Sequence, residues 1–120
     1  MEDYNKMILG DSKEILKSMP EQIIDMVVTS PPYDKLRYYE NNESDWNFDT
    51  FKEIAQQLYR LMKPGGVIVW VVGDSTIKGG KSLNSYRQAI YFQEIGFTIF
   101  DVIIYEKTGS GPPHKNRYFN

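Results

Sequence analysis

Apolar residues along the chain form two kinds of pattern, short continuous runs and runs with helical spacing. Continuous runs of a few residues, bounded by Gly, Pro or Asp, are typical of strands buried in a sheet. Four such strands are predicted, at residues 7–9, 23–29, 67–72 and 97–106. The run at 23–29 is apolar almost throughout, with Asp25 as the main exception, so it is expected to be buried on both faces.

Helix-like segments separate these strands. Asp11 with Glu14, and Thr50 with Glu53, have the spacing of a capping box, in which each side chain accepts a backbone N–H at a helix start. Pro20 is expected to end the first helix, because proline cannot continue it. The second helix shows the i, i+3, i+4, i+7 spacing of an amphipathic helix. The inward positions are Ile15, Leu16 and Met19 in the first helix and Phe51, Ile54, Ala55, Leu58, Leu61 and Met62 in the second.

A third helix is predicted to open at Ser85, with Gln88 completing another capping box, and to close at Gly96. Residues 34–49 and 73–84 are polar or glycine-bearing and are expected to be loops. The apolar positions of the third helix are Tyr86, Ala89, Ile90 and Ile95, and Pro64-Gly65-Gly66 is expected to stop the second helix. Helices that regularly separate apolar strands predict an α/β fold with a mainly parallel sheet and flanking helices, within one domain.

Composition narrows the function classes. The 120 residues contain no cysteine, which excludes disulfides, cysteine zinc sites and a thiolate nucleophile. Fourteen Lys and Arg against 16 Asp and Glu give a net charge of −2. That balance does not predict a self-sufficient nucleic-acid binder, so any grip on DNA must be local or supplied elsewhere. No apolar run approaches the ~20 residues of a membrane span, and no signal peptide is evident. A cytoplasmic protein without a membrane partner is expected.

The segment Ser30-Pro31-Pro32-Tyr33 carries the candidate chemistry. It follows the carboxyl end of the predicted strand 23–29, where ligands bind in open α/β sheets. Two prolines remove two N–H donors and fix φ, so the turn is stiff and presents only acceptors, the Ser30 hydroxyl oxygen and the carbonyls around Pro31. Tyr33 adds an aromatic plate.

A rigid pair of acceptors beside an aromatic ring suits an exocyclic base amine. The lone pair of such a nitrogen is delocalised into the base, which makes it a poor nucleophile. Acceptors for both of its N–H groups favour a tetrahedral nitrogen that can attack a methyl sulfonium directly. No covalent enzyme intermediate is needed, in agreement with the absence of cysteine.

The segment resembles the Ser/Asp/Asn-Pro-Pro-Tyr motif of the DNA adenine-N6 and cytosine-N4 methyltransferases. The resemblance covers residues 6–120 with the family's motifs in order. The other similar segments are Ile8-Leu9-Gly10-Asp11-Ser12, Asp25-Met26-Val27-Val28-Thr29-Ser30, Leu61-Met62-Lys63-Pro64-Gly65-Gly66, Val72-Gly73-Asp74 and Gln93-Glu94-Ile95-Gly96-Phe97. It implies a partial Rossmann-like methyltransferase fold, S-adenosylmethionine as cofactor, no metal, and double-stranded DNA with a flipped target base as substrate.

The resemblance also implies roles for the residues of the Ser-Pro-Pro-Tyr segment. Ser30 and the Pro31 carbonyl would hold the target amine, Pro32 would complete the catalytic motif, and Tyr33 would stack on the flipped base. The methyl group would pass to N6 of adenine or N4 of cytosine, and the family does not decide between them because Ser occurs in this position with both.

Further roles that the resemblance implies lie outside this segment. Gly10, Asp11 and Thr29 would lie on the cofactor side, and Asp74 would border the base pocket. From the residues alone, Asp11 is equally well explained as a helix cap. Asp74, which follows a predicted strand, is more often explained as a turn residue.

One departure from the family concerns the cofactor site. The glycine-rich Phe-x-Gly-x-Gly motif that holds the methionine part of S-adenosylmethionine is missing, and so is a target-recognition region. We therefore expect the permuted motif order and interpret residues 1–120 as a single, incomplete catalytic domain, the N-terminal half of an enzyme. Alone it is expected to be inactive, with a C-terminal half or self-association needed to complete it.

Two other functions remain open at this stage. The chain is alternatively a non-catalytic remnant of such an enzyme, or an amino-methyltransferase that acts on RNA or protein. A surface role is the first expectation, and a nucleic-acid contact the alternative, for Tyr38, Tyr39, Trp46, Lys78, Lys81 and Arg87. His114 is expected to be exposed to solvent and not catalytic.

Overall fold

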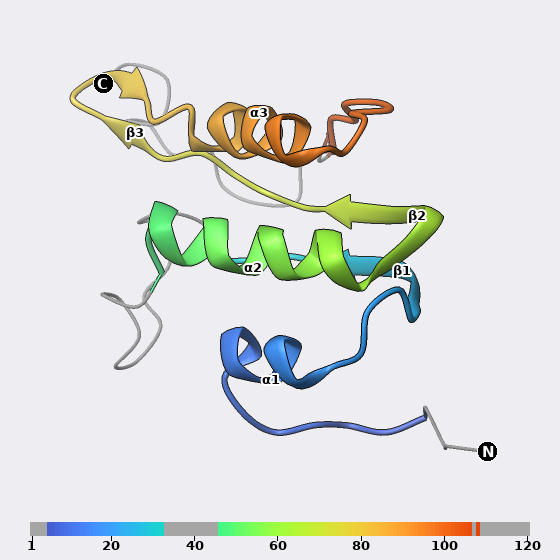
Figure 1. Cartoon of the computed structure of the whole chain (residues 1–120). Helices are drawn as coiled ribbons and strands as arrows, with labels where there is room; N and C mark the ends of the chain where they lie inside the picture. Colours follow the sequence, from blue (N-terminus) through green and yellow to red (C-terminus); the bar gives the residue numbers. More distant parts are fainter. Residues whose placement is uncertain (1–4, 33–45, 107, 109–120) are drawn as a thin grey trace.

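The computed structural model describes residues 5–32, 46–106 and 108. The elements in this part of the chain are α1 (Ser12–Ser18), β1 (Ile24–Thr29), α2 (Phe48–Leu61), β2 (Met62–Trp70), β3 (Thr76–Ile77), β4 (Gly80–Lys81) and α3 (Asn84–Ile95). Strands β1 and β2 pair in parallel, and α2 connects them (Figure 1). The predicted α/β class, with parallel strands and flanking helices, is confirmed.

Helix α2 is the central helix of the fold. Its predicted inner face is confirmed by the burial of Phe51, Ala55, Leu58 and Leu61. The predicted capping box of Thr50 and Glu53 is wrong, because the helix begins earlier. Its cap is Asn47, whose side-chain oxygen accepts the Thr50 N–H at 2.8 Å, so Thr50 already lies in the first turn.

The core is an aromatic cluster between α2, α3 and one face of the sheet. The Phe51 ring is fully buried, 5.7 Å from the ring of Trp70 on β2 and 5.3 Å from that of Phe92 on α3. Trp70 also donates its indole N–H to the Oε1 of buried Gln88 at 3.0 Å. Ring contacts and this hydrogen bond fix α3 against the strand.

The two faces of the β1–β2 sheet differ in burial. The register pairs Met26 with Val67 and Val28 with Val69, so these four side chains share the face opposite the aromatic cluster. With Val71 they are between 39 and 65% exposed. The prediction that the strand at 23–29 is buried on both faces is therefore wrong, because α2 and α3 cover one face only.

Strand β2 begins at Met62, earlier than predicted. Ile24 lies opposite Met62 and Met26 opposite Val67, so the ladder has an irregularity that accommodates the Pro-Gly-Gly segment. A Cβ added at Gly66 would lie 2.7 Å from the Met62 Cε and 3.0 Å from the Asp25 carbonyl oxygen, so only glycine fits. The helix has already ended at Leu61, and Pro64–Gly66 forms the irregular start of the strand.

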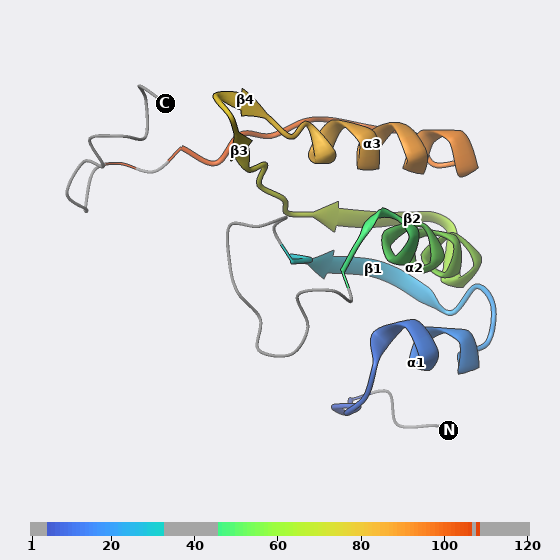
Figure 2. The ribbon, with the colours of Figure 1, turned by 90° about the vertical axis from the view of Figure 1, so that its left-hand side faces the viewer.

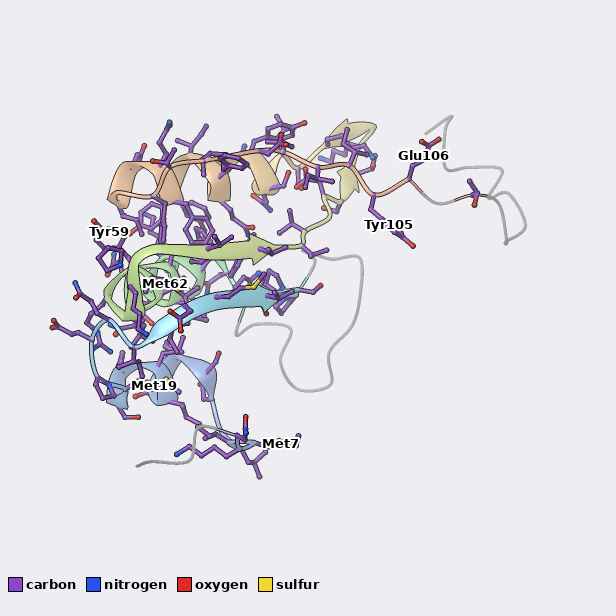
Figure 3. The ribbon with its side chains drawn as sticks, turned by 90° about the vertical axis from the view of Figure 1, so that its right-hand side faces the viewer. Met7, Met19, Tyr59, Met62, Tyr105 and Glu106 are labelled. Atoms are coloured by element: carbon purple, nitrogen blue, oxygen red, sulfur yellow. The ribbon has the colours of Figure 1, made fainter. Side chains whose placement is uncertain are left out.

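Two predicted strands, at residues 7–9 and 97–106, are wrong. Neither segment is in a strand, and Leu9 and Phe100 are almost completely exposed. A strand needs a neighbour for its backbone groups, and in the described part of the chain the parallel sheet consists of β1 and β2. In Figure 3 the segment that carries Tyr105 and Glu106 leads away from the helices and the sheet.

Helix α3 closes at Gly96, as predicted. Its predicted apolar positions are partly wrong, because Tyr86 and Ile90 are exposed while Gln88 and Phe92 are buried. The helix is oriented by the contacts of these two residues with Trp70. It also starts without a side-chain cap from the preceding residue, so the Ser85–Gln88 capping box is wrong as well.

Helix α1 is attached to α2 through Arg60. The guanidinium donates to the carbonyls of Leu16 at 2.8 Å and Met19 at 2.9 Å, which satisfies two acceptors at the end of α1. The predicted inward positions Ile15, Leu16 and Met19 are half-buried. This contact holds α1 alongside α2, as Figure 2 shows.

Candidate functional site

The Thr29–Pro32 turn lies at the carboxyl end of β1, where the chain leaves the sheet. Thr29 pairs with Trp70, and its carbonyl accepts the Val71 N–H at 2.9 Å, so the ladder holds the chain up to the residue before Ser30. Pro31 is buried and Ser30 is exposed. Tyr33 lies outside the described residues.

This arrangement holds the backbone of the turn in place and leaves the Ser30 side chain exposed. Ladder bonds on one side and a buried, φ-restricted Pro31 on the other leave the backbone little freedom. Neither proline has an N–H, so the polar groups of the turn are mainly acceptors. Chemically, the turn can receive a group that carries two N–H donors, such as a base amine or a side-chain amide.

Gly10 and Asp11 begin α1. The Asp11 Oδ1 accepts the Lys13 N–H at 2.9 Å, so the helix-cap interpretation is confirmed, and the carboxylate is exposed. At Gly10, φ is +156° and an added Cβ would lie 2.6 Å from the Ile15 Cδ1. In Figure 3, Met7, just before this turn, lies toward the side where β1 ends, and Met19 toward the side where it begins. The cofactor role of Gly10, Asp11 and Thr29 stays a prediction.

Asp74 follows the end of β2 and connects it to α3. Its Oδ1 accepts the Ser85 N–H at 2.8 Å, its Oδ2 accepts the Ser85 hydroxyl at 2.6 Å, and the Ser82 hydroxyl lies 3.4 Å from its Oδ1. The carboxylate thus caps α3 from a distance, where a negative charge stabilises a helix start. The prediction that Asp74 borders a base pocket stays a prediction.

The loop predicted at 73–84 contains a hairpin, β3–β4. Its two central residues, Lys78 and Gly79, have φ of +51° and +80°, as two-residue hairpin turns require. The Lys81 Nζ donates to the Thr76 Oγ1 across the strands at 2.9 Å. An X-Gly pair between short runs is the sequence signal that could have revealed this hairpin.

The start of α1, the carboxyl end of β1 and the segment between β2 and β3 lie on the side toward which both strands point (Figure 2). The sequence-predicted groups Gly10–Asp11, Thr29–Pro32 and Asp74 belong to these three segments. Of the predicted aromatics, Trp46 packs against the buried cluster around Phe51, while Tyr38, Tyr39 and His114 lie outside the described residues. Among the residues that the structure describes, no three His, Asp or Glu side chains are grouped as metal ligands. No helix in the described ranges is long and apolar enough to cross a membrane.

Comparison with known proteins gives consistent matches. A DNA methylase family model covers residues 24–120. The orphan methyltransferase M.BamHII of Bacillus amyloliquefaciens is 55% identical over 96 residues, which are 80% of this chain and 34% of that protein. The type II beta methyltransferase M.BslI of Bacillus sp. (strain NEB-606) is 34% identical over 130 residues, 96% of this chain and 14% of that protein. The chain thus spans about a third or less of the length of these relatives.

Solved structures give the same result at the level of the fold. The PvuII DNA methyltransferase, described as cytosine-N4-specific, superposes with a TM-score of 0.57 at 33% identity, over 72% of this chain and 32% of that one. A DNA modification methylase candidate from Thermus thermophilus, in complex with S-adenosyl-L-methionine, superposes with a TM-score of 0.56 over 90% of this chain and 58% of that one. Its identity of 24% supports the fold alone.

Proposed function

Because this chain belongs to the DNA methylase family, we propose that it is the part of a DNA amino-methyltransferase that holds the target base amine. The donor is S-adenosylmethionine, and the acceptor is the N6 amine of adenine or the N4 amine of cytosine. The observation that carries the proposal is the Ser30-Pro31-Pro32 turn, whose two prolines have no N–H, fixed at the carboxyl end of β1 with Pro31 buried.

In the proposed mechanism, the Ser30 hydroxyl oxygen and the Pro31 carbonyl accept hydrogen bonds from the two N–H groups of the amine and so orient its lone pair. Catalysis of this kind depends on acceptors that are already in place when charge develops on the nitrogen. The ladder bond from the Val71 N–H to the Thr29 carbonyl supports that preorganisation. Tyr33 is proposed to stack on the flipped base.

The cofactor proposal rests on the chemistry of the carboxyl edge. The exposed Asp11 carboxylate can accept the ribose hydroxyls of an adenosyl group, and Gly10 beside it carries no side chain that would hinder a ligand. S-adenosylmethionine, when bound, supplies the electrophilic methyl group. A relative of the same fold has been crystallised with this molecule.

Two further features belong to the proposal. The 120 residues contain no Phe-x-Gly-x-Gly segment, so we assign them a catalytic half-site that needs a complementary half for methyl transfer. DNA is favoured over RNA or protein because the matched relatives are DNA and type II methyltransferases. We keep both cytosine and adenine as proposed targets, because the PvuII enzyme is described as cytosine-N4-specific.

The test uses this chain joined to the part of M.BamHII that follows its matched segment. We expect methyl transfer from labelled S-adenosylmethionine to duplex DNA, and a loss of about 100-fold or more in kcat for Ser30→Ala, because one acceptor for the amine is removed. Ser30→Asp keeps an acceptor at that position and serves as the control. Digestion of the product to nucleosides distinguishes N6-methyladenine from N4-methylcytosine. Full activity of the Ser30→Ala protein would contradict the role of Ser30.

A further inference from the structure

The β3–β4 hairpin and the start of α3 form a local positive surface on an acidic protein. From residue 75 to residue 93 the chain has no Asp or Glu, but it has Lys78, Lys81 and Arg87. Since the whole chain carries −2, the remaining residues carry −5. In the described part of the chain, this is the segment in which three cations occur without an acidic residue, which is the feature expected of a local contact to phosphate.

The cations of this segment differ from three other lysines of the chain in whether a carboxylate lies beside them. Lys13, Lys17 and Lys63 each lie within 3.6 Å of a carboxylate oxygen, of Glu53, Glu14 and Asp25 respectively. In the described part of the chain, none of Lys78, Lys81 and Arg87 forms such an ion pair, and all three are exposed. Their charge is not neutralised from within the described protein.

Local structure orients these cations. Lys78 stands at the apex of the hairpin, in a left-handed conformation that glycine or asparagine adopts more readily. Lys81 is directed across the hairpin by its bond to the Thr76 hydroxyl. The Arg87 guanidinium is held by the Ser82 carbonyl and by the Asn84 Oδ1 at 3.0 Å, and it has further N–H donors for a ligand.

The hairpin follows the strand that pairs with the residue before the candidate catalytic turn. That strand is β2, whose final residue pairs with Thr29, the residue before Ser30. In Figure 2, β3 and β4 lie on the side toward which both β1 and β2 point. Asp74, through its bonds to Ser82 and Ser85, ties the base of the hairpin to α3. A polymer whose base entered the Ser30 turn would approach the sheet from this same side.

We propose that the β3–β4 hairpin is a phosphate-contacting element, in which Lys78 and Lys81 bind the backbone of the DNA strand that carries the target base. The inference rests on the proposed function, since it assumes that DNA is the substrate. It adds to that function a local contact to DNA phosphates, which the net charge of −2 does not predict. Phosphate contacts of this kind position the strand without reading its sequence.

The experiment measures binding of a short fluorescent DNA duplex to the 120-residue chain by anisotropy, over a series of salt concentrations. Each phosphate contact contributes about 0.9 to the slope of log K against log salt for duplex DNA. We expect Lys78→Gln/Lys81→Gln to reduce the slope by about 1.8. Glutamine keeps a long side chain with a donor, and circular dichroism verifies that each variant is folded.

The matched control is Lys17→Gln/Lys63→Gln, which removes the same charge near the start of β1, at the opposite edge of the sheet. Its slope is expected to equal that of the unchanged chain. Equal slopes for the two double variants, no binding of the unchanged chain at low salt, or tighter binding of an RNA duplex would each overturn the proposal. Failure of methyl transfer with normal hairpin-dependent DNA binding would contradict the proposed function and leave the hairpin's role standing.

Discussion

The two faces of the β1–β2 sheet use the same strands in opposite ways. On one face, Trp70 meets the rings of Phe51 and Phe92 and donates to Gln88. On the other face, Val28 and Val69 stand side by side and are 65 and 39% exposed. Alternate residues of one strand therefore experience either a close-packed interior or water.

The difference shows which face stabilises this part of the molecule. Burial of apolar surface stabilises in proportion to the area removed from water, so the aromatic face contributes most and the valine face little. Yet this exposed face carries mainly valine, as do strands that are covered on both sides. Such β-branched strands are typical of parallel sheets between two helical layers. Substitutions on the two faces should separate these contributions.

The largest effect is expected for Phe51→Ala. Its ring is fully buried against four other rings, those of Phe48, Trp70, Tyr91 and Phe92, so truncation removes apolar contacts and leaves a cavity. The free energy of unfolding should fall by about 3–5 kcal/mol, measured by urea denaturation with circular dichroism. Val28→Ala on the exposed face is the control, with a much smaller expected loss. Equal losses at the two positions would contradict the contrast between the faces.

An intermediate effect is expected for Trp70→Phe. The variant keeps an aromatic ring but removes the N–H that donates to Gln88, whose side chain is only 5% exposed. A buried acceptor left without its partner costs about 1–3 kcal/mol in the free energy of unfolding. The double variant Trp70→Phe/Gln88→Leu should recover part of that loss, because it removes the buried polar group as well. No recovery would show that ring packing, and not the hydrogen bond, holds α3 here.

The smallest effect is expected for Val28→Thr and Val69→Thr. Both side chains are on the exposed face, where a hydroxyl remains in contact with water, so each change should alter the free energy of unfolding by less than about 0.5 kcal/mol. Val27→Thr, on the covered face and half-buried, should cost more, about 1–2 kcal/mol, because its hydroxyl loses water. Chemical denaturation of the three variants side by side measures this. A larger loss at Val28 than at Val27 would mean that the assignment of the faces is reversed.

Local patterns were sufficient to predict much of the fold. The apolar spacing of α2 identified Phe51, Ala55 and Leu58, because a helix satisfies its own backbone and needs only one apolar face. The end of β1 at Thr29 was also predicted, since the Ser-Pro-Pro segment cannot continue a ladder. The position of the candidate catalytic turn follows from these local rules.

Features that depend on distant residues could not be predicted in this way. Residues 7–9 and 97–106 have strand-like composition, but a strand forms only against a neighbour. The start of α3 is capped by Asp74 from across the hairpin, and the residue before the helix, Leu83, gives no sign of it. The burial of Gln88 likewise depends on Trp70, far away in sequence.

The hydrogen bond from the Val71 N–H to the Thr29 carbonyl has a consequence for the time course of folding. Met26 and Val67, paired in the same ladder, are about 40 residues apart, so pairing must first overcome the entropy of closing a long loop. Helix α2 can form from local contacts on a much shorter timescale. We therefore expect the Ser30 turn to receive its support only when this slow, non-local step is complete, so that the helices precede the site in the order of assembly.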